Sequence, residues 1–331
     1  MPSLSQLAVS IVLGSIVIGI SWVFAQGDGY WRSPTPSASL PSVQHSATSQ
    51  LPAAEHLTQQ WFVTPAQAIA LVADGATLLD ARSHRQHTQG MLAGSVAVSW
   101  RQFSHEDKPN QGKLLGDRDQ LAQELRSAGV SNNVPVVVIG DPLEGWGEDG
   151  RIVWMLRTLG HQKAVLVDGG YDALVAAGMP TVESVLRSAS TPGNFVIDRT
   201  PQWTVQQDEL KAALDHPQWV IVDVREEREF DGQTPYGEQR GGHVPGAVHL
   251  YYRELMDENG TILPRRKLLH VLAEHGIRPD AQIVSYCTGG IRSGWFTAVL
   301  TSVGFDAKNY AGSMWEWSAS PRDDYPLVEE N

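Results

Sequence analysis

The sequence predicts an α/β fold made of two similar halves, each with a central parallel sheet flanked by helices. Short β-branched runs between loops, such as Pro135–Ile139 (PVVVI) and Ile283–Tyr286 (IVSY), are typical of the buried strands of such a sheet. The same order of motifs occurs twice along the chain. With 331 residues, of which 42% are hydrophobic, the protein is long enough for two domains that each bury a core.

The repeat keeps its spacing between two landmarks. Asp80 in LLDAR corresponds to Asp223 in VIVDVR, and Gly169 in VDGGYDAL corresponds to Gly312 in YAGSMWEW. The separation between aspartate and glycine is the same in both halves, although the second half carries an insertion around Gln233–Arg240. Equal spacing between corresponding motifs indicates a duplicated domain.

The elements of each half follow in the same order. Thr64 and Pro65 are typical of a helix N-terminus, and the strand Thr77–Asp80 comes next. In the second half Thr204 precedes a helix (VQQDELKAAL), and Trp219–Asp223 forms the next strand. Each half then continues with a helix, a strand, a second helix, another strand, a loop that carries glycine and a last helix.

The N-terminus carries a different signal. Leu7–Ala25 is an uncharged apolar run long enough to span a bilayer as a helix, so residues 1–26 are expected to form a transmembrane anchor or signal segment. Residues 27–60 are rich in Ser, Pro, Gln and Ala, which is typical of a flexible, disordered linker. No Lys or Arg precedes the run, whereas a signal peptide normally has a basic start. We therefore favour an anchor at the membrane, with the body outside the cytoplasm.

Composition excludes several classes of function. A formal net charge of −12 and a pI near 5.3 argue against a general nucleic-acid binder. Cys287 is the one cysteine, so an intramolecular disulfide framework and a cysteine-based structural zinc site are excluded. The histidines show no spacing typical of metal ligands. A cysteine without context is most often a small buried hydrophobe, so its neighbours decide its interpretation.

Cys287 lies in the stretch SYCTGGIRSGW, directly after a predicted strand. Ligands of an open parallel sheet bind at the carboxyl ends of its strands. Ser293 is expected to cap the next helix, which would place the loop between a strand end and a helix start. Gly289 and Gly290 let the backbone curl with its N–H groups toward the sulfur, and the helix dipole adds to them. The sequence therefore predicts a lowered pKa for Cys287.

Arg292 adds a full positive charge at the rim of this loop. Its planar fork of donors suits an oxyanion such as a sulfonate or carboxylate group. The alternative is an arginine that makes a local salt bridge. The combination with the cysteine, the glycines and the helix start favours a role in binding.

The segment CTGGIRS, from Cys287 to Ser293, resembles the active-site loop of the rhodanese superfamily of sulfurtransferases. DVREEREFDG, GGHVPGAVHL and YAGSMWEW in the same half are similar to the flanking motifs of that family. The resemblance implies two rhodanese-like domains, an inactive one at residues 61–180 and a catalytic one at residues 203–331, joined by an interdomain linker at residues 181–202.

The resemblance also implies a double-displacement reaction. The Cys287 thiolate would attack the outer sulfur of a donor such as thiosulfate and hold it as a persulfide. A thiophilic acceptor such as cyanide, a thiol or a thiol protein would then remove the sulfur, and no metal or organic cofactor is required. Loop backbone groups would stabilise the anion, and Arg292 would steer the donor. The implied substrate-binding residues are Thr288, Gly289, Gly290, Ile291, Arg292 and Ser293, with Asp223 and Arg225 as supporting residues.

Loop length separates this interpretation from its nearest rival. Four residues lie between Cys287 and Arg292, whereas phosphatases and arsenate reductases of similar architecture have five there. The smaller ring suits a single sulfur atom better than a phosphate. The first half aligns Gly140 or Asp141 with Cys287, and acidic residues in that loop would repel anions. We expect the first half to be catalytically silent, with a packing role and as a wall of the cleft.

Other residues of the second half have less specific signals. Asp223 and Arg225 are expected either to orient the active loop or to form a local structural pair, and the sequence leaves both open. His243 in GGHVPG is expected to be structural, because transfer from a thiolate of low pKa needs no general base. Trp315 and Trp317 are expected in the core or in the cleft wall.

Two functions of other classes also stay open at this point. A non-catalytic rhodanese module could dock a partner at a membrane, and a persulfide or redox carrier could use the same thiolate. The donor is open as well. Arg292 favours thiosulfate, but Thr288, Gly289 and Gly290 do not match the basic residues often present after the cysteine of thiosulfate-specific enzymes, and 3-mercaptopyruvate is the alternative donor.

Overall fold

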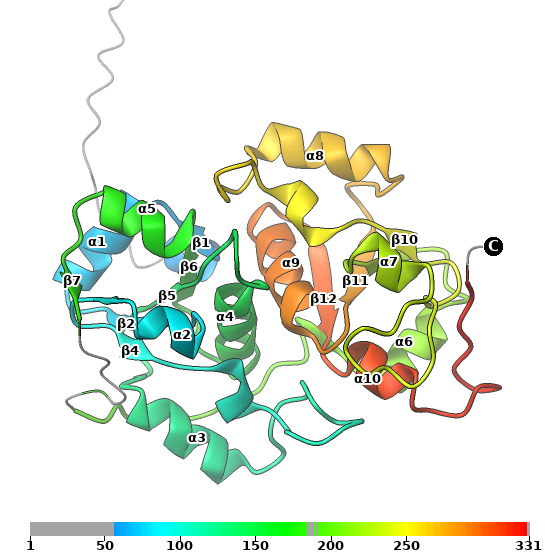
Figure 1. Cartoon of the computed structure of the whole chain (residues 1–331), viewed down its shortest axis with the longest axis horizontal. Coiled ribbons are helices and arrows are strands. Elements are labelled where there is room, and N and C mark those ends of the chain that lie inside the picture. Colours follow the sequence, from blue (N-terminus) through cyan, green and yellow to red (C-terminus); the bar gives the residue numbers. More distant parts are fainter. Residues whose placement is uncertain (1–55, 184–188, 190, 330–331) are drawn as a thin grey trace, which may run out of the picture. The chain divides into compact units, whose positions relative to one another are not determined.

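The computed structural model describes residues 56–183, 189 and 191–329, and these belong to one compact unit (Figure 1). The expected membrane segment at residues 1–26 and most of the expected linker lie outside the described residues. Among the residues that are described, no helix is both long enough and apolar enough to cross a membrane.

Each half contains a five-stranded parallel sheet, as the fold class requires. The strand order is β1-β6-β5-β2-β4 in the first sheet and β10-β9-β11-β12-β8 in the second. The central strands are buried on both faces because helices cover the two faces of each sheet. The predicted α/β class with two parallel sheets is confirmed.

The elements of the first half begin with a 3₁₀ helix and end in a short strand that pairs antiparallel with β3. Their bounds are η1 His56–Thr58, β1 Phe62–Val63, α1 Pro65–Ala73, β2 Thr77–Asp80, α2 His84–His87, β3 Met91–Leu92, β4 Val96–Ala97, η2 Trp100–Phe103, α3 Arg118–Ser127, β5 Val136–Ile139, α4 Glu148–Thr158, β6 Ala164–Val167, α5 Gly170–Ala176 and β7 Thr181–Val182.

The second half repeats this order around its own sheet. Its elements are β8 Thr204–Val205, α6 Gln207–Ala213, β9 Trp219–Asp223, α7 Glu227–Phe230, β10 Val248–His249, η3 Tyr252–Leu255, α8 Arg265–Glu274, β11 Gln282–Tyr286, α9 Ile291–Ser302, β12 Asp306–Tyr310 and α10 Ser313–Trp317.

Local sequence explains why several elements begin where they do. The hydroxyl of Thr64 accepts from the Gln67 N–H, and the Gln67 side chain accepts from the Thr64 N–H, so α1 starts with a complete capping box. In the second half Thr204 precedes a helix, as expected, but α6 begins at Gln207 rather than Val205. Thr204 and Val205 form the edge strand β8, which pairs with β12. Helix α6 is capped by Gln206, whose N–H donates to Glu209.

The structured part of the chain begins before the expected boundary at residue 61. Leu57 is buried, and the guanidinium of Arg157 donates to the carbonyls of Leu57, Thr58 and Gln60. The connection between the halves is also packed, since Phe195 lies in the core. Burial of these side chains fixes segments whose composition resembles that of a linker.

Helices α4 and α9 join the two halves (Figure 1). They can approach closely because glycines lie at the contact: an added Cβ on Gly294 would lie 3.1 Å from the Cα of Arg151, and one on Gly150 would overlap Trp295. Buried residues of both helices, including Trp154 and Trp295, belong to one hydrophobic cluster. The first half is therefore packed directly behind the helix that follows Cys287.

Candidate active site

Cys287 lies at the carboxyl edge of the second sheet. It follows Tyr286, the last residue of β11, and β11 pairs with β9 on one side and β12 on the other. The side chain is buried, with 1% of the residue exposed. The backbone of Cys287 is held from the start of α10, since its N–H donates to the hydroxyl of Ser313 at 3.1 Å and its carbonyl accepts from Met314 at 3.1 Å.

Two groups of the loop donate to the sulfur. The Gly290 N–H lies 3.1 Å from Sγ, and the Ser293 hydroxyl lies 3.5 Å from it. Gly290 has a φ of 81°, a left-handed value that glycine adopts without strain. It is the N-cap of α9, so this helix begins at Ile291. The expectation that Ser293 caps the helix is wrong, because its hydroxyl is turned to the sulfur.

The surroundings of Cys287 favour its thiolate. Burial alone would raise the pKa of the thiol, but the charge of Arg292 and hydrogen bonds from Ser293 and the loop backbone outweigh burial. The pKa of Cys287 therefore lies below its ordinary value, in the direction that the sequence predicts.

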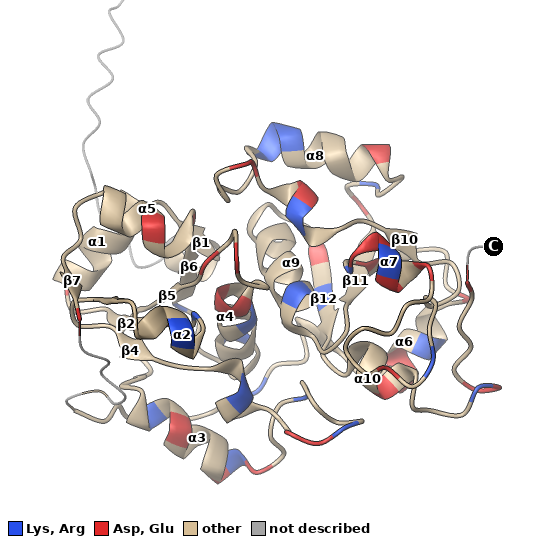
Figure 2. Ribbon diagram, viewed as in Figure 1, with Lys and Arg blue, Asp and Glu red and all other residues tan. Residues whose placement is uncertain are grey.

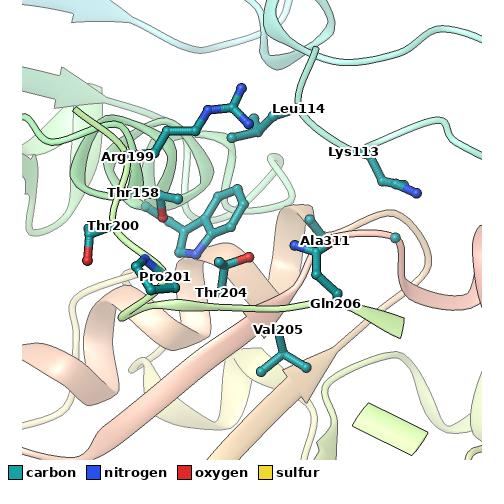
Figure 3. Close-up of a pocket in the computed structure, with 12 residues that line it drawn as sticks. Lys113, Leu114, Thr158, Arg199, Thr200, Pro201, Thr204, Val205, Gln206 and Ala311 are labelled. Carbon is teal, nitrogen blue, oxygen red and sulfur yellow. The ribbon is translucent and has the colours of Figure 1, made fainter. Parts of the chain in front are cut away.

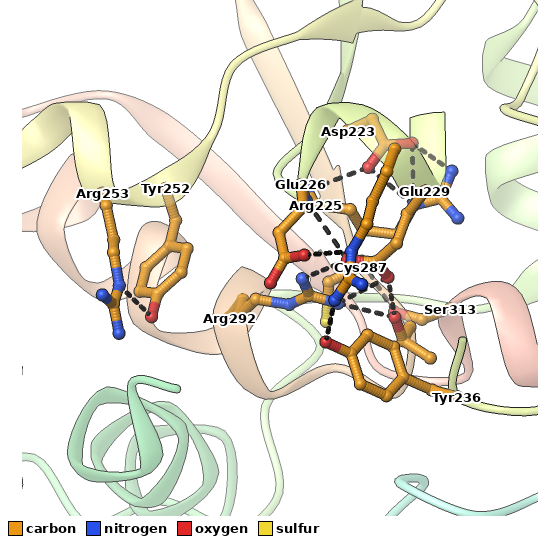
Figure 4. Close-up of polar contacts among 12 residues, drawn as sticks. Asp223, Arg225, Glu226, Glu229, Tyr236, Tyr252, Arg253, Cys287, Arg292 and Ser313 are labelled. Carbon is orange, nitrogen blue, oxygen red and sulfur yellow. Dashed lines mark hydrogen bonds and ion pairs between the residues drawn. The ribbon is translucent and has the colours of Figure 1, made fainter. Parts of the chain in front are cut away.

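Arg292 is not free at the rim of the loop (Figure 4). It is 3% exposed, and its guanidinium donates to both carboxylate oxygens of Glu229 at 2.5 and 2.9 Å and to the Thr288 hydroxyl at 2.6 Å. Thr288 in turn donates to Glu229 at 2.6 Å. The charge of Arg292 is thus compensated, and its contacts are those of the local salt bridge that the sequence left as the alternative.

Glu229 was missed as a site residue, although it lies within the DVREEREFDG motif. It is fully buried at the end of α7. Burial opposes its ionisation, but the hydrogen bonds and charge of Arg292 outweigh this and lower its pKa. A buried arginine needs a carboxylate partner, yet no sequence spacing marks which of the 37 acidic residues supplies it.

Asp223 and Arg225 form a buried pair with each other. Arg225 donates to both oxygens of Asp223 and to the Gly242 carbonyl, and neither side chain has a hydrogen bond to the Cys287 loop among the described contacts. The first half repeats this pair as Asp80 and Arg82, where no cysteine follows. Since the pair occurs beside a nucleophile and without one, its contacts fit the structural alternative.

Of His243, Trp315 and Trp317, only Trp315 lines the pocket of Cys287. His243 stacks on Phe230 and its Nδ1 lies 3.0 Å from the Phe230 carbonyl, away from the sulfur. Trp317 lies in the core. Trp315 lines the pocket above Cys287, and an added Cβ on Gly289 would overlap its ring.

A pocket of about 450 Å³ opens above Cys287. Both halves supply its wall, and the part from the first half was not identified by residue from the sequence. The lining consists of Trp100, Arg101, Lys108, Gln111, Trp146 and Glu148 from the first half and Tyr236, Cys287, Thr288, Gly289, Ile291, Arg292 and Trp315 from the second. The pocket is roomy, has aromatic walls and holds the sulfur on its floor.

The first half has a different loop at the corresponding edge. Ile139 pairs with Asp80 as Tyr286 pairs with Asp223, so Gly140 is the counterpart of Cys287. An added Cβ on Gly140 would lie 2.7 Å from the Asp149 carboxyl carbon, which means that this acid fills the place of a nucleophile. Figure 2 shows acidic residues in the first turn of α4 and a basic residue near the start of α9.

Burial raises the pKa of Asp149 to about 7. The first half therefore presents an acid of raised pKa, where the second presents a thiol of lowered pKa.

Another pocket, of about 330 Å³, lies between the halves (Figure 3). Trp154, Thr158 and Arg199 line it together with Thr204 and Ala311. Cys287 is not part of its lining, so it is separate from the pocket above the sulfur. In the described part of the chain no cluster of three or more His, Cys, Asp or Glu is arranged to hold a metal ion.

Comparison with known proteins finds the same family domain in each half of the chain. The model of the rhodanese-like domain matches residues 64–177 and again residues 206–320. The thiosulfate sulfurtransferase of Azotobacter vinelandii is 30% identical over 245 residues, which cover 74% of this chain and 88% of that protein. The thiosulfate sulfurtransferase of Pseudomonas aeruginosa is 27% identical over 245 residues, with the same coverage of 74% and 88%.

Solved structures support the same fold. SseA from Escherichia coli, described as a 3-mercaptopyruvate sulfotransferase, superposes with a TM-score of 0.66 at 23% identity and covers 77% of this chain and 98% of its own. EanB in complex with ergothioneine superposes with a TM-score of 0.70 at 18% identity and covers 83% of this chain and 70% of its own. At these identities the likeness concerns the fold.

Proposed function

The chain belongs to the rhodanese-like family as a sulfurtransferase, and we propose that Cys287 carries the transferred sulfur as a persulfide. The observation that carries this proposal is the position of Cys287. It forms the floor of an open pocket, receives two hydrogen bonds at Sγ and has a lowered pKa. The donor that this chemistry suits best is thiosulfate, with 3-mercaptopyruvate as the alternative.

The proposed reaction has two displacements. The Cys287 thiolate attacks the outer sulfur of thiosulfate, a new S–S bond forms, and sulfite leaves with the electron pair of the old S–S bond. The acceptor, for example cyanide, then attacks the terminal sulfur and leaves as thiocyanate, and the thiolate is restored. The Gly290 N–H and the Ser293 hydroxyl remain close to the sulfur through both steps and stabilise its negative charge.

Within this proposal, the donor's anionic group binds Arg101 and Lys108 rather than Arg292. Glu229 already compensates Arg292. Arg101 lies over the Trp100 ring, and Lys108 donates to two backbone carbonyls, of Tyr236 and Gly237. Neither cation forms an ion pair with a described carboxylate, so both keep a net charge at the pocket. The silent half thus supplies the donor-binding charge.

Thiocyanate formation tests the persulfide mechanism. We expect the full chain, kept in mild detergent, to form thiocyanate from cyanide with thiosulfate, and Cys287→Ala to lose this activity. Mass spectrometry of the donor-treated chain should show one added sulfur atom, because Cys287 is the one thiol. Parallel assays with 3-mercaptopyruvate rank the donors. Equal inactivity of both chains with both donors would exclude the proposed turnover and favour a docking module.

Kinetics test the two cations of the first half. We expect Arg101→Ala and Lys108→Ala each to raise KM for thiosulfate about tenfold with a smaller change in kcat, since each removes a charge that binds the donor. Lys267→Ala removes an exposed lysine on α8 and serves as the control. An unchanged KM in both pocket variants would show that the donor binds elsewhere.

We also propose that the N-terminal segment anchors the enzyme at a membrane, with the body outside the cytoplasm. The apolar run Leu7–Ala25 supports this. The full chain should sediment with membranes and resist carbonate extraction, while a chain lacking residues 1–26 should stay in the supernatant. Protease added to intact cells with a permeable envelope should cleave the body. Recovery of the full chain from the supernatant would contradict the anchor.

A further inference from the structure

Arg151 lies directly behind the active loop and comes from the half that lacks a nucleophile. It is on α4, 1% exposed, and packs with its guanidinium 4.5 Å from the Trp154 ring centroid. Among the described residues no carboxylate lies within ion-pair distance of it. Burial of an arginine without an acid is costly, and any negative charge nearby would reduce that cost.

The hydrogen bonds of Arg151 all go to neutral groups. Its guanidinium donates to the Gly290 carbonyl at 3.3 Å, to the Ser104 hydroxyl at 3.2 Å and to the Gly112 carbonyl. Gly290 is the residue whose N–H donates to Sγ of Cys287. The contact therefore connects the guanidinium to the loop through a single residue.

We infer that Arg151 is a positioning residue of the active site: its charge is balanced by the Cys287 thiolate, and its hydrogen bond to the Gly290 carbonyl helps to hold the residue whose N–H donates to the sulfur. Gly290 is thus held at both of its backbone polar groups: its carbonyl accepts from Arg151, and its N–H donates to Sγ. The charges of two arginines then act on the thiolate, that of Arg292 from its own half and that of Arg151 from the other.

Electrostatics agrees with this geometry. Burial lowers the pKa of Arg151 to about 9, and the charge of Cys287 acts in the opposite direction. Arg151 therefore stays protonated at neutral pH. The same attraction, seen from the sulfur, favours the thiolate over the thiol.

Other charged and titratable groups also surround the pair and are common to every variant proposed below. They are Arg292 of α9, Glu229 of α7, Glu148 and Asp149 of α4, and Arg101, Lys108 and Tyr236 around the pocket.

Arg157 provides a matched control within the same helix. It is also 1% exposed and also bonds to backbone carbonyls without a carboxylate partner among the described residues. Burial lowers its pKa to about 9 as well, but its contacts are at the N-terminal segment rather than at the Cys287 loop. Arg157→Met therefore reproduces the loss of a buried arginine without the proposed effect on the sulfur.

The experiment measures the rate of alkylation of Cys287 by iodoacetamide in the full chain as a function of pH. Cys287 is the one cysteine, so the signal has one source. We expect Arg151→Met to lower the rate about tenfold at pH values below the thiol pKa, and to leave the high-pH plateau unchanged, because removal of a nearby charge raises the thiol pKa. Arg151→Lys keeps the charge and should restore most of the rate.

Arg151→Gln carries the test if Arg151→Met does not fold, since its amide can still donate to the Gly290 carbonyl while the charge is gone. Asn309 also donates to that carbonyl at 3.2 Å, so the loop keeps an anchor in each variant. A profile that shifts in the neutral variants and not in Arg157→Met supports the inference. Superimposable profiles for the neutral variants and wild type would overturn it.

The inference depends on the proposed function only in the choice of Cys287 as the reactive group. Thiocyanate formation is measured on the same samples. If wild type gives no turnover, the proposed function fails, while the alkylation profiles still decide the role of Arg151. If wild type turns over and the profiles superimpose, only the role of Arg151 fails.

Discussion

Replacement of Glu229 by Gln should destabilise the catalytic half strongly, because it leaves the buried charge of Arg292 without its partner. The glutamate is fully buried and accepts three hydrogen bonds from Arg292 and Thr288. Removing one partner of such a pair typically costs about 3 to 5 kcal/mol. Gln keeps the shape and one acceptor oxygen, so we expect a loss of about 3 kcal/mol in the free energy of unfolding.

The control is an exposed ion pair at the start of the same helix, α7. Glu226 accepts from Arg228 at 2.6 Å, but the two side chains are 34% and 48% exposed. Glu226→Gln should change the free energy of unfolding by less than about 1 kcal/mol, because exposed pairs contribute little. The two substitutions are chemically identical, so the difference between them reports burial.

Urea unfolding at pH 7, followed by tryptophan fluorescence, measures both variants, provided that the slope of the transition stays constant. Adding Arg292→Met to Glu229→Gln should recover part of the lost stability, because the unpaired charge is then removed as well. Equal small losses in the Glu229 and Glu226 variants would refute the reasoning. It would mean that water reaches Arg292 and that the pair is not buried in solution.

Other predictions follow from the same contacts. The stability that ionised Glu229 contributes is fully present above its unfolded pKa and is lost as pH falls through its lowered folded pKa. The free energies of unfolding of wild type and Glu229→Gln should therefore converge in acid. A constant difference between them down to low pH would contradict this. The pH dependence of stability at Asp149 is the reverse, because its raised pKa, about 7, makes the ionised form unfavourable in the fold. Asp149→Asn should therefore raise Tm at pH 8 and have little effect at pH 5. A gain in Tm that did not depend on pH would argue against a buried ionisable carboxyl. Gly289→Ala should lower both stability and sulfur transfer because its Cβ would overlap the Trp315 ring. Gly116→Ala, with open space around the added methyl group, should leave both unchanged. If neither substitution changed stability or activity, the Trp315 ring would have to move freely.

Much of the local structure could be predicted from short-range patterns. The strands Thr77–Asp80 and Trp219–Asp223 lie at their predicted bounds, because β-branched buried runs flanked by loops have few other ways to be buried. The cap at Thr64 was also predictable, since its partner Gln67 is three residues away. The prediction of a cap at Ser293 was wrong, because its side chain has another partner in the tertiary structure. Ser293 donates to the sulfur, and Gly290 is the N-cap of α9.

The position of Cys287 at the carboxyl edge of the sheet could be predicted from the sequence, because the cysteine directly follows a buried strand and precedes a loop with two glycines. The partners of its thiol could not be predicted. Glu229 is 63 residues before Arg292, and Arg151 is 139 residues before Gly290. Contacts at such separations depend on how two sheets and two crossing helices pack, and no periodicity in the sequence records that packing.

The sequence by itself determined the fold class, the duplication and the single nucleophile, since each rests on spacing within one element or between repeated motifs. Tertiary structure alone decided which charges act at the site. It pairs Arg292 with Glu229, directs Arg101 and Lys108 to the pocket, and buries Arg151 behind the loop. The reason is physical: the effect of a charge depends on its burial and on the distance to its partners, and both exist only once the two halves are packed together.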